Sequence, residues 1–156
     1  MPKPTSMMKK LCINGALIFA LLALGTTQGI AFDKFNNTYG TAISGYDTVA
    51  YHTEERAMKG KAELSYKWND ANWHFASAEN RNLFAADPER YAPQFGGYCT
   101  GSLSYGMIPR PNPVIFKIVD GKLYFANSTR WRNKVIGNQI AMKRAQDEWA
   151  RFNKEH

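Results

Sequence analysis

The sequence predicts a small α+β domain, and three patterns lead to this prediction. Between Glu63 and Phe75, apolar and polar residues alternate as they do in a β-strand that buries one face. The pair Asp120-Gly121 lies between two apolar runs, which is a strong signal for a hairpin turn. From Gly137 onward, apolar residues recur at helical spacing. We therefore expect two β-hairpins, two to three short helices and a C-terminal helix.

The first hairpin is expected over residues 63–75, with its turn at 69–72 (NDAN). The face that should pack inward consists of alternate residues on both strands: Leu64, Tyr66, Trp68, Trp73 and Phe75. The same alternation points His74 away from this apolar face. Ahead of the hairpin, Gly45 and Gly60 mark turns, and residues 49–51 (VAY) are expected to end a strand.

Two short helices are expected after the hairpin, because each follows a residue that can cap it. The Ser77 hydroxyl can accept a hydrogen bond from an unpaired backbone N–H of the first turn. Asp87 can act in the same way, and Pro88 suits the first helical position, where its missing N–H costs nothing.

The second hairpin is expected to run from 114–119 (VIFKIV) through Asp120-Gly121 to 122–126 (KLYFA), after an extended proline-containing loop. The last helix should begin near Gly137-Asn138. Its apolar stripe is expected to cover the core and comprises Ile140, Ala141, Ala145, Trp149 and Phe152.

Residues 1–31 have the order of a secretory signal peptide, because three lysines precede an uncharged apolar run at 11–24. This run is about 14 residues long, whereas a membrane-spanning helix needs roughly 20. Cleavage is expected after Ala31, with a second candidate site after Gly25, and Cys12 would leave with the signal. The sequence therefore predicts a periplasmic or secreted protein, with membrane contact only through an uncleaved signal. A retained N-terminal anchor is the competing interpretation.

Removal of residues 1–31, which hold three lysines and no acidic residue, lowers the formal net charge from +7 to +4. The remaining chain of about 125 residues suffices for one domain with a core. Its basic residues are scattered rather than concentrated on one face, so no nucleic-acid partner is expected. We also find no paired carboxylates, catalytic triad or phosphate-binding loop, and a non-catalytic protein is predicted.

Three motifs follow one another in a fixed order. They are GYD-x-VAY from Gly45, F-x-S-A-E-N-R from Phe75, and F-x-x-D-P-E-x-Y-A-P-x-F-G-G-Y-C, which ends at Cys99. With these motifs, residues 43–99 resemble a YHS domain of the form found in exported bacterial proteins. The polar residues before this segment predict a lead-in at 32–42. The resemblance implies a family-type extension at 100–156, with a hairpin and a C-terminal helix packed on the same core.

The resemblance supports an inference about the fold, but not an inference about a metal site. The cysteine-bearing branch of the family is associated with heavy-metal ATPases and other metal-handling proteins, and its motifs resemble D-P-V-C and Y-F-C-S-x-x-C. In this chain, Ala50 or one of its neighbours stands near the first of these cysteines. Ala76 stands at the second and Asn80 at the third. The thiolates that would hold a soft or borderline metal are missing. Function belongs to the site rather than to the scaffold.

Cys99 has four competing interpretations. It is a small buried side chain, a metal ligand, a redox or intermolecularly paired thiol, or a nucleophile, which is weakest because no base is apparent. As a ligand it would join His74 and His52, with Met107 or Met58 as thioethers, and copper or another soft or borderline metal would suit such a set. A hydrogen-bonded structural role is the alternative for His74.

Asp47 has two interpretations as well. It either closes an Asx turn or presents a carboxylate at the mouth of a small-ligand pocket shared with Tyr51 and Tyr98. These interpretations lead to two alternative hypotheses about function. The first is a non-catalytic periplasmic YHS-type binding module for a metal ion, with copper favoured, or for a small ligand. The second is a structural or interaction protein with an unknown protein partner, a decayed metal site and a buried, inert Cys99.

Overall fold

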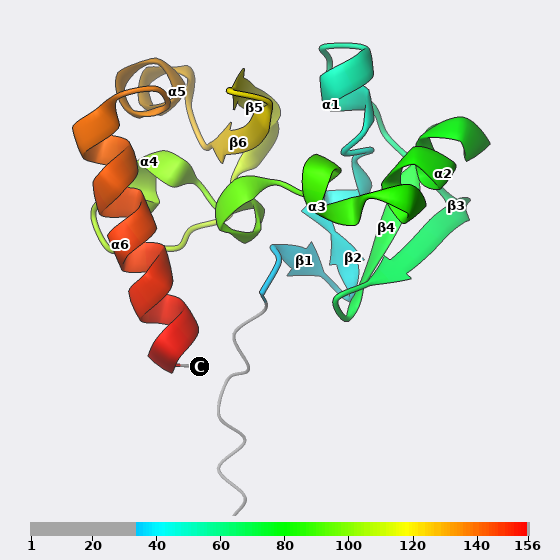
Figure 1. Ribbon diagram of the computed structural model, residues 1–156, viewed down its shortest axis with the longest axis horizontal. Helices are drawn as coiled ribbons and strands as arrows, with labels where there is room; N and C mark the ends of the chain where they lie inside the picture. Colours follow the sequence, from blue (N-terminus) through cyan, green and yellow to red (C-terminus); the bar gives the residue numbers. More distant parts are fainter. Residues whose placement is uncertain (1–33, 156) are drawn as a thin grey trace, which may run out of the picture. The chain divides into compact units, whose positions relative to one another are not determined.

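Two antiparallel hairpins and the helices that follow them organise residues 34–155, the part of the chain that the computed structural model describes (Figure 1). The architecture is α+β, as predicted. The predicted signal peptide and its cleavage site lie outside the described residues. Within residues 34–155, no helix is both long and apolar enough to cross a membrane.

The first sheet has four strands in the order β1-β2-β4-β3. Its members are β1 (Asn37–Thr38), β2 (Thr41–Ala42), β3 (Lys61–Trp68) and β4 (Ala71–Phe75). Strands β3 and β4 form the first predicted hairpin. Its turn is tighter than expected, because Asn69 and Asp70 alone make it, with φ of 46° and 59°.

The two faces of this hairpin differ as the alternation predicts. Trp73 and Phe75 are buried, and the apolar residues of β3 pack against them. Helix α2 (Ala78–Ala86) covers this face with Phe84, whose ring centroid lies 5.0 Å from that of Trp73. His74 lies on the other face of the sheet, where it is half-buried.

The expected strand end at residues 49–51 is wrong, because the chain forms helix α1 (Ala50–Thr53) there. The backbone N–H groups of Val49 and Ala50 donate to Asp47 Oδ1 at 2.9 and 3.2 Å. These bonds satisfy N–H groups that a helix start leaves unpaired. A local turn thus overrides the strand preference of valine and tyrosine.

Both predicted caps are confirmed. The Ser77 hydroxyl accepts from the Asn80 N–H at 3.1 Å at the start of α2. Asp87 accepts from the Arg90 N–H at 3.3 Å at the start of α3 (Pro88–Tyr91), with Pro88 in the first turn. The 3₁₀ turn η2 (Gln94–Gly97) and helix α4 (Thr100–Leu103) follow.

The second hairpin pairs β5 (Asn112–Val119) with β6 (Lys122–Ala126). Asp120 and Gly121 form its turn with φ of 51° and 71°, as predicted. Strand β6 is central to the packing, because Leu123 and Phe125 join the core cluster that includes Trp73 and Phe75. Strand β6 therefore shares a core with the first hairpin.

Helix α5 (Thr129–Val135) precedes the long helix α6 (Gln139–Glu155). Ala145 of α6 is fully buried, but Ile140 is 70% exposed, so Ile140 is not part of the packed stripe. At 3.6 residues per turn, Ile140 lies about 140° around the helix from Ala145. Met142 packs instead, against the cluster that contains Cys99.

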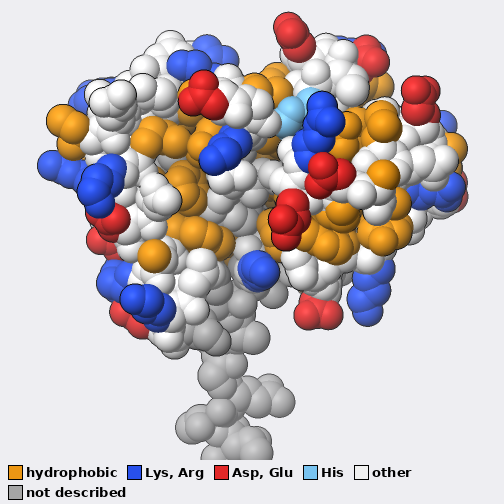
Figure 2. Space-filling view, viewed as in Figure 1, with side chains coloured by type: hydrophobic (Ala, Val, Ile, Leu, Met, Phe, Trp, Pro, Cys, Tyr) orange, Lys and Arg blue, Asp and Glu red, His pale blue; other side chains and the backbone are white. Residues whose placement is uncertain are grey.

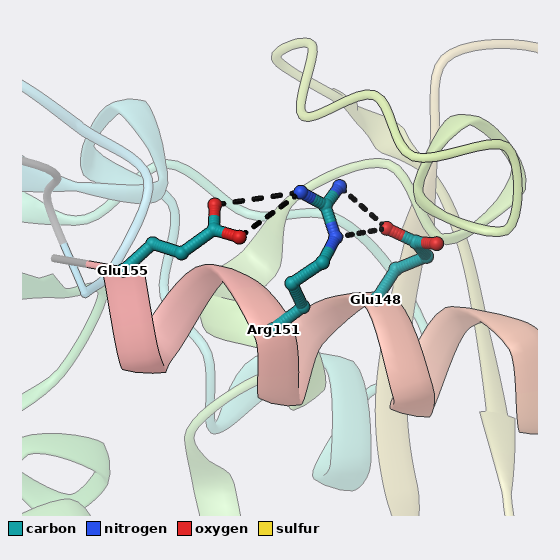
Figure 3. Close-up of polar contacts among 3 residues, drawn as sticks. All are labelled: Glu148, Arg151 and Glu155. Carbon is teal, nitrogen blue, oxygen red and sulfur yellow. Dashed lines mark hydrogen bonds and ion pairs between the residues drawn. The ribbon is translucent and has the colours of Figure 1, made fainter.

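The outer side of α6 carries an ion-pair network, drawn in Figure 3. Arg151 bonds Glu148 at 2.7 Å and Glu155 at 3.3 Å. Pairs with this exposure contribute little to stability. On the face shown in Figure 2, basic and acidic side chains are interspersed rather than gathered by sign.

Candidate functional site

Cys99 lies in the protein core. Its side chain is fully buried in a cluster with Tyr124, Ala126 and Ile136. Its sulfur accepts hydrogen bonds from the Asn127 N–H at 3.3 Å and from the Ser102 hydroxyl at 3.5 Å. The surroundings are those of a small packing residue with its sulfur bonded within the fold.

The two candidate histidines lie elsewhere. His52, on α1, meets the ring of Tyr91 edge-on with centroids 5.5 Å apart, and its buried Nε2 has no hydrogen-bond partner in the described part of the chain. Burial, and secondarily the Arg90 guanidinium, lower the pKa of His52. His74 lies on β4, on the outward face of the sheet.

The structure does not assemble Cys99, His74 and His52 into one metal site. No three or more His, Cys, Asp or Glu side chains between residues 34 and 155 are grouped so that they could hold a metal ion. Of the two candidate thioethers, Met107 is 56% exposed. Met58 contributes its backbone carbonyl to the Asp47 N–H at 2.9 Å.

Asp47 is fully buried and is not among the residues that line the pocket beside His74. The Asx turn is confirmed by the bond from the Val49 N–H to Oδ1. Oδ2 accepts from the Ala76 N–H at 2.8 Å and from Asn80 Nδ2 at 2.7 Å. With the bond from Ala50, the carboxylate accepts four hydrogen bonds, which compensate for its removal from water.

The other two predicted ligand-binding residues are also part of the packing. Tyr51 is fully buried, and its hydroxyl donates to the Pro113 carbonyl at 2.8 Å. Burial is the main cause that raises the pKa of Tyr51 above its ordinary value. Tyr98 is 9% exposed, and its ring centroid lies 6.0 Å from that of Trp149. These contacts place Tyr51 and Tyr98 in the packing rather than around a cavity with Asp47.

The Asp47 network occupies the positions at which the family resemblance implies cysteines. Ala50, Ala76 and Asn80 stand at or near those positions, and all three donate to the Asp47 carboxylate. No local sequence pattern predicts this convergence, because Asp47 and Asn80 are 33 residues apart.

A pocket of about 340 Å³ lies on the outward face of the first sheet. Its lining residues are mainly small and polar: Thr38, Thr41, Ser44, Gly45, Lys59, Gly60 and His74. Only His74 was a candidate from the sequence. The others escaped notice because two-residue strands and turns carry no periodic signal.

The backbone around the pocket is tightly built. The 3₁₀ turn η1 (Ile43–Gly45) has φ of 47°, 53° and 76° at its three residues. Gly60 pairs with this turn, since its N–H donates to the Gly45 carbonyl at 2.9 Å. A Cβ on Gly60 would overlap the backbone of His74 and Phe75, so only glycine allows this approach.

Several polar groups of the pocket have unused hydrogen-bonding capacity. The His74 imidazole and the Thr41 and Ser44 hydroxyls take part in none of the side-chain hydrogen bonds found among residues 34–155. Lys59 Nζ donates to the Ser44 carbonyl at 2.7 Å, and this is one of its three donor positions. These groups can bond a ligand or water.

Comparison of the chain with protein-family models, with curated proteins and with solved structures finds no match in any of the three. The YHS resemblance remains a prediction from the motifs.

Proposed function

We propose that this protein is an exported, non-catalytic binding module of the YHS type that holds a small polar ligand in the pocket beside His74. The observation that carries the proposal is the pocket itself, in which an imidazole, two hydroxyls and an ammonium group have free hydrogen-bonding positions. We also propose that the protein functions without a metal ion bound to Cys99.

The size and construction of the pocket support ligand binding. Small-molecule sites span roughly 300–1,000 Å³ and place a few polar groups on a preformed wall. The volume of about 340 Å³ falls at the lower end of this range. His74 projects from a strand with paired neighbours on both sides, and Gly60 packs directly on its backbone. Such a wall loses little freedom when a ligand binds.

The surroundings of Cys99 support the part of the proposal that excludes a metal ion there. A cysteine ligand needs its sulfur free to meet the metal, along with further donors at fixed distances. The Cys99 sulfur is fully buried and accepts from Asn127 and Ser102. Copper binding there would require opening of this cluster.

The pocket also lacks the arrangement of a nucleophilic enzyme. Activation of a hydroxyl requires a base within hydrogen-bonding reach of it. No hydrogen bond joins the His74 imidazole to the Thr38, Thr41 or Ser44 hydroxyl in the described residues. This supports a non-catalytic role.

The proposal can be tested by amide NMR on ¹⁵N-labelled protein expressed from the full chain. Small neutral, anionic and cationic polar molecules would be added in turn, and at least one class should shift the Gly45 and Gly60 amides saturably. Thr41→Phe, which fills the pocket, should abolish these shifts. Thr129→Phe, at an exposed position outside the pocket, should leave them unchanged.

If no class of molecule shifts the pocket amides, the proposal fails. The same holds if Thr41→Phe and Thr129→Phe behave alike. The function left would then be the structural or interaction role, which a buried Cys99 and a hydrogen-bonded Asp47 also suit.

A further inference from the structure

We infer that the ligand of the His74 pocket is a small organic molecule with an anionic group, a carboxylate or a phosphate. The inference rests on the proposed function and adds the chemical class of the ligand. It is drawn from the charges around the pocket, because the shape of the pocket alone does not determine the chemical class of the ligand.

One cation lines the cavity, and a second bonds one of its lining residues. Lys59 is part of the lining, and its Nζ bonds only a neutral acceptor, the Ser44 carbonyl. Arg110 NH1 donates to the Thr38 hydroxyl at 2.9 Å, and Thr38 is also part of the lining. Neither cation belongs to an ion pair among residues 34–155.

No carboxylate lies among the lining residues. On the neighbouring strand β3, the residue paired with His74 is Ser65, which is neutral. Glu63 and Lys67 lie on the same outward face of β3, one of each sign, and neither lines the pocket. Among the described residues that line the pocket or bond its lining through side chains, Lys59 and Arg110 are the charged groups, and both favour an anion.

The position of Lys59 is constrained before any ligand arrives. Its Nζ lies 4.1 Å from the centroid of the Tyr46 ring, a cation–π contact, while it also bonds the Ser44 carbonyl. Backbone pairing of Tyr46 with Lys59 holds the backbone from which the Lys59 side chain projects. An ammonium held in this way can donate charge-assisted hydrogen bonds, which are about twice as strong as neutral ones.

The remaining donors complete the recognition of an anion. The Thr41 and Ser44 hydroxyls can each donate one hydrogen bond, and the His74 imidazole can donate another. Carboxylate and phosphate groups accept several such bonds at once. The cavity of about 340 Å³ leaves room for an organic remainder beside the anionic group.

The test compares four probes by the same amide NMR titration: succinate, inorganic phosphate, glycerol and tetramethylammonium. Succinate or phosphate should shift the Gly45 and Gly60 amides saturably, whereas glycerol and tetramethylammonium should not. Which of the two anions binds more tightly distinguishes a carboxylate ligand from a phosphate ligand.

Charge variants then locate the interaction. Lys59→Gln should weaken anion binding about tenfold or more, and Lys59→Arg, which keeps the charge, should restore most of it. Arg110→Gln should weaken binding severalfold. Lys67→Gln is the matched control, because it removes one positive charge from the same sheet face outside the pocket, and binding should stay within about twofold of wild type.

Three results would overturn the inference. If glycerol or tetramethylammonium shifts the pocket amides and the anions do not, the pocket binds ligands of another class, and the proposed function stands without the inference. If Lys67→Gln weakens anion binding as much as Lys59→Gln, the anions respond to general surface charge. If none of the four probes shifts the pocket amides, the anion inference fails, and failure of the wider screen as well would remove the proposed function.

Discussion

Asp47 and Asn80 meet through a hydrogen bond of 2.7 Å that Asn80 Nδ2 donates to Asp47 Oδ2 across 33 residues of chain. The same carboxylate accepts from the Val49 and Ala50 N–H groups at the start of α1 and from the Ala76 N–H after β4. Asp47 therefore ties together three segments that are distant in sequence. Buried carboxylates are tolerated when such bonds replace their water.

Asp47→Ala should strongly destabilise the fold, because it leaves four donors without their acceptor. We expect a loss of about 3 kcal/mol or more in the free energy of unfolding, measured by urea denaturation. Asn80→Ala removes one of the four bonds and should cost about 1 kcal/mol. Equal stability of wild type and Asp47→Ala would show that the network does not hold these segments.

Gly60→Ala should disrupt the approach of residue 60 to β4, because the added Cβ overlaps the His74 carbonyl and the Phe75 nitrogen. Gly121→Ala is the comparison: its Cβ meets nothing within 4 Å, and its cost of about 1 kcal/mol comes from its positive φ alone. Thermal unfolding should therefore show a clearly larger loss for Gly60→Ala. The reverse order of the two variants would contradict the packing described here.

His52 should make the protein less stable in mild acid. Burial lowers its pKa below the ordinary value of 6.5, so the unfolded chain takes up the proton before the folded one does. Stability is then unaffected by His52 above pH 6.5 and falls as the pH drops below it, until the folded-state pKa is passed. His52→Phe keeps an aromatic ring against Tyr91 and removes the titration.

The check is urea denaturation of both proteins at pH 7 and pH 5. Carboxylates contribute equally to both proteins, so the loss of stability between these pH values should be smaller in His52→Phe. Parallel pH profiles of the two proteins would show that His52 does not contribute to the pH dependence of stability.

Cys99 should be unreactive toward a thiol reagent in the native protein and should react fully after unfolding, since its side chain is completely buried. Cys99→Ala removes a buried sulfur without adding a polar group, so the fold and binding at the His74 pocket should survive with a stability loss of about 1–2 kcal/mol. Rapid reaction of the native thiol would place Cys99 in an accessible site.

Both hairpins and the caps of α2 and α3 were predictable because their signals are local. Asn69, Asp70 and Gly121 act within a few residues of the strands they join, and Ser77 and Asp87 act within one turn. Helix α1 was mispredicted because Val49 and Tyr51 favour a strand in isolation, although the bonds from Val49 and Ala50 to Asp47 are local.

The candidate site was harder to predict because it depends on contacts between distant segments. The pocket brings residues 38–45 and 59–60 to His74, and strands of two residues have no period to detect. The burial of Cys99 depends on its pairing with Phe125 of β6, which no local pattern shows. From sequence alone, packing was the favoured interpretation of this thiol, with metal ligation as its main alternative.

The most direct test of the proposed binding site is an amide NMR titration of one wild-type sample with succinate and of a second with copper(I). We predict saturable shifts of the Gly45 and Gly60 amides with succinate, and no stoichiometric shift of the Cys99 and Asn127 amides with copper. Stoichiometric copper binding that shifts Cys99 and Asn127 and disappears in Cys99→Ser, with unchanged pocket amides in succinate, would contradict this placement of the binding site.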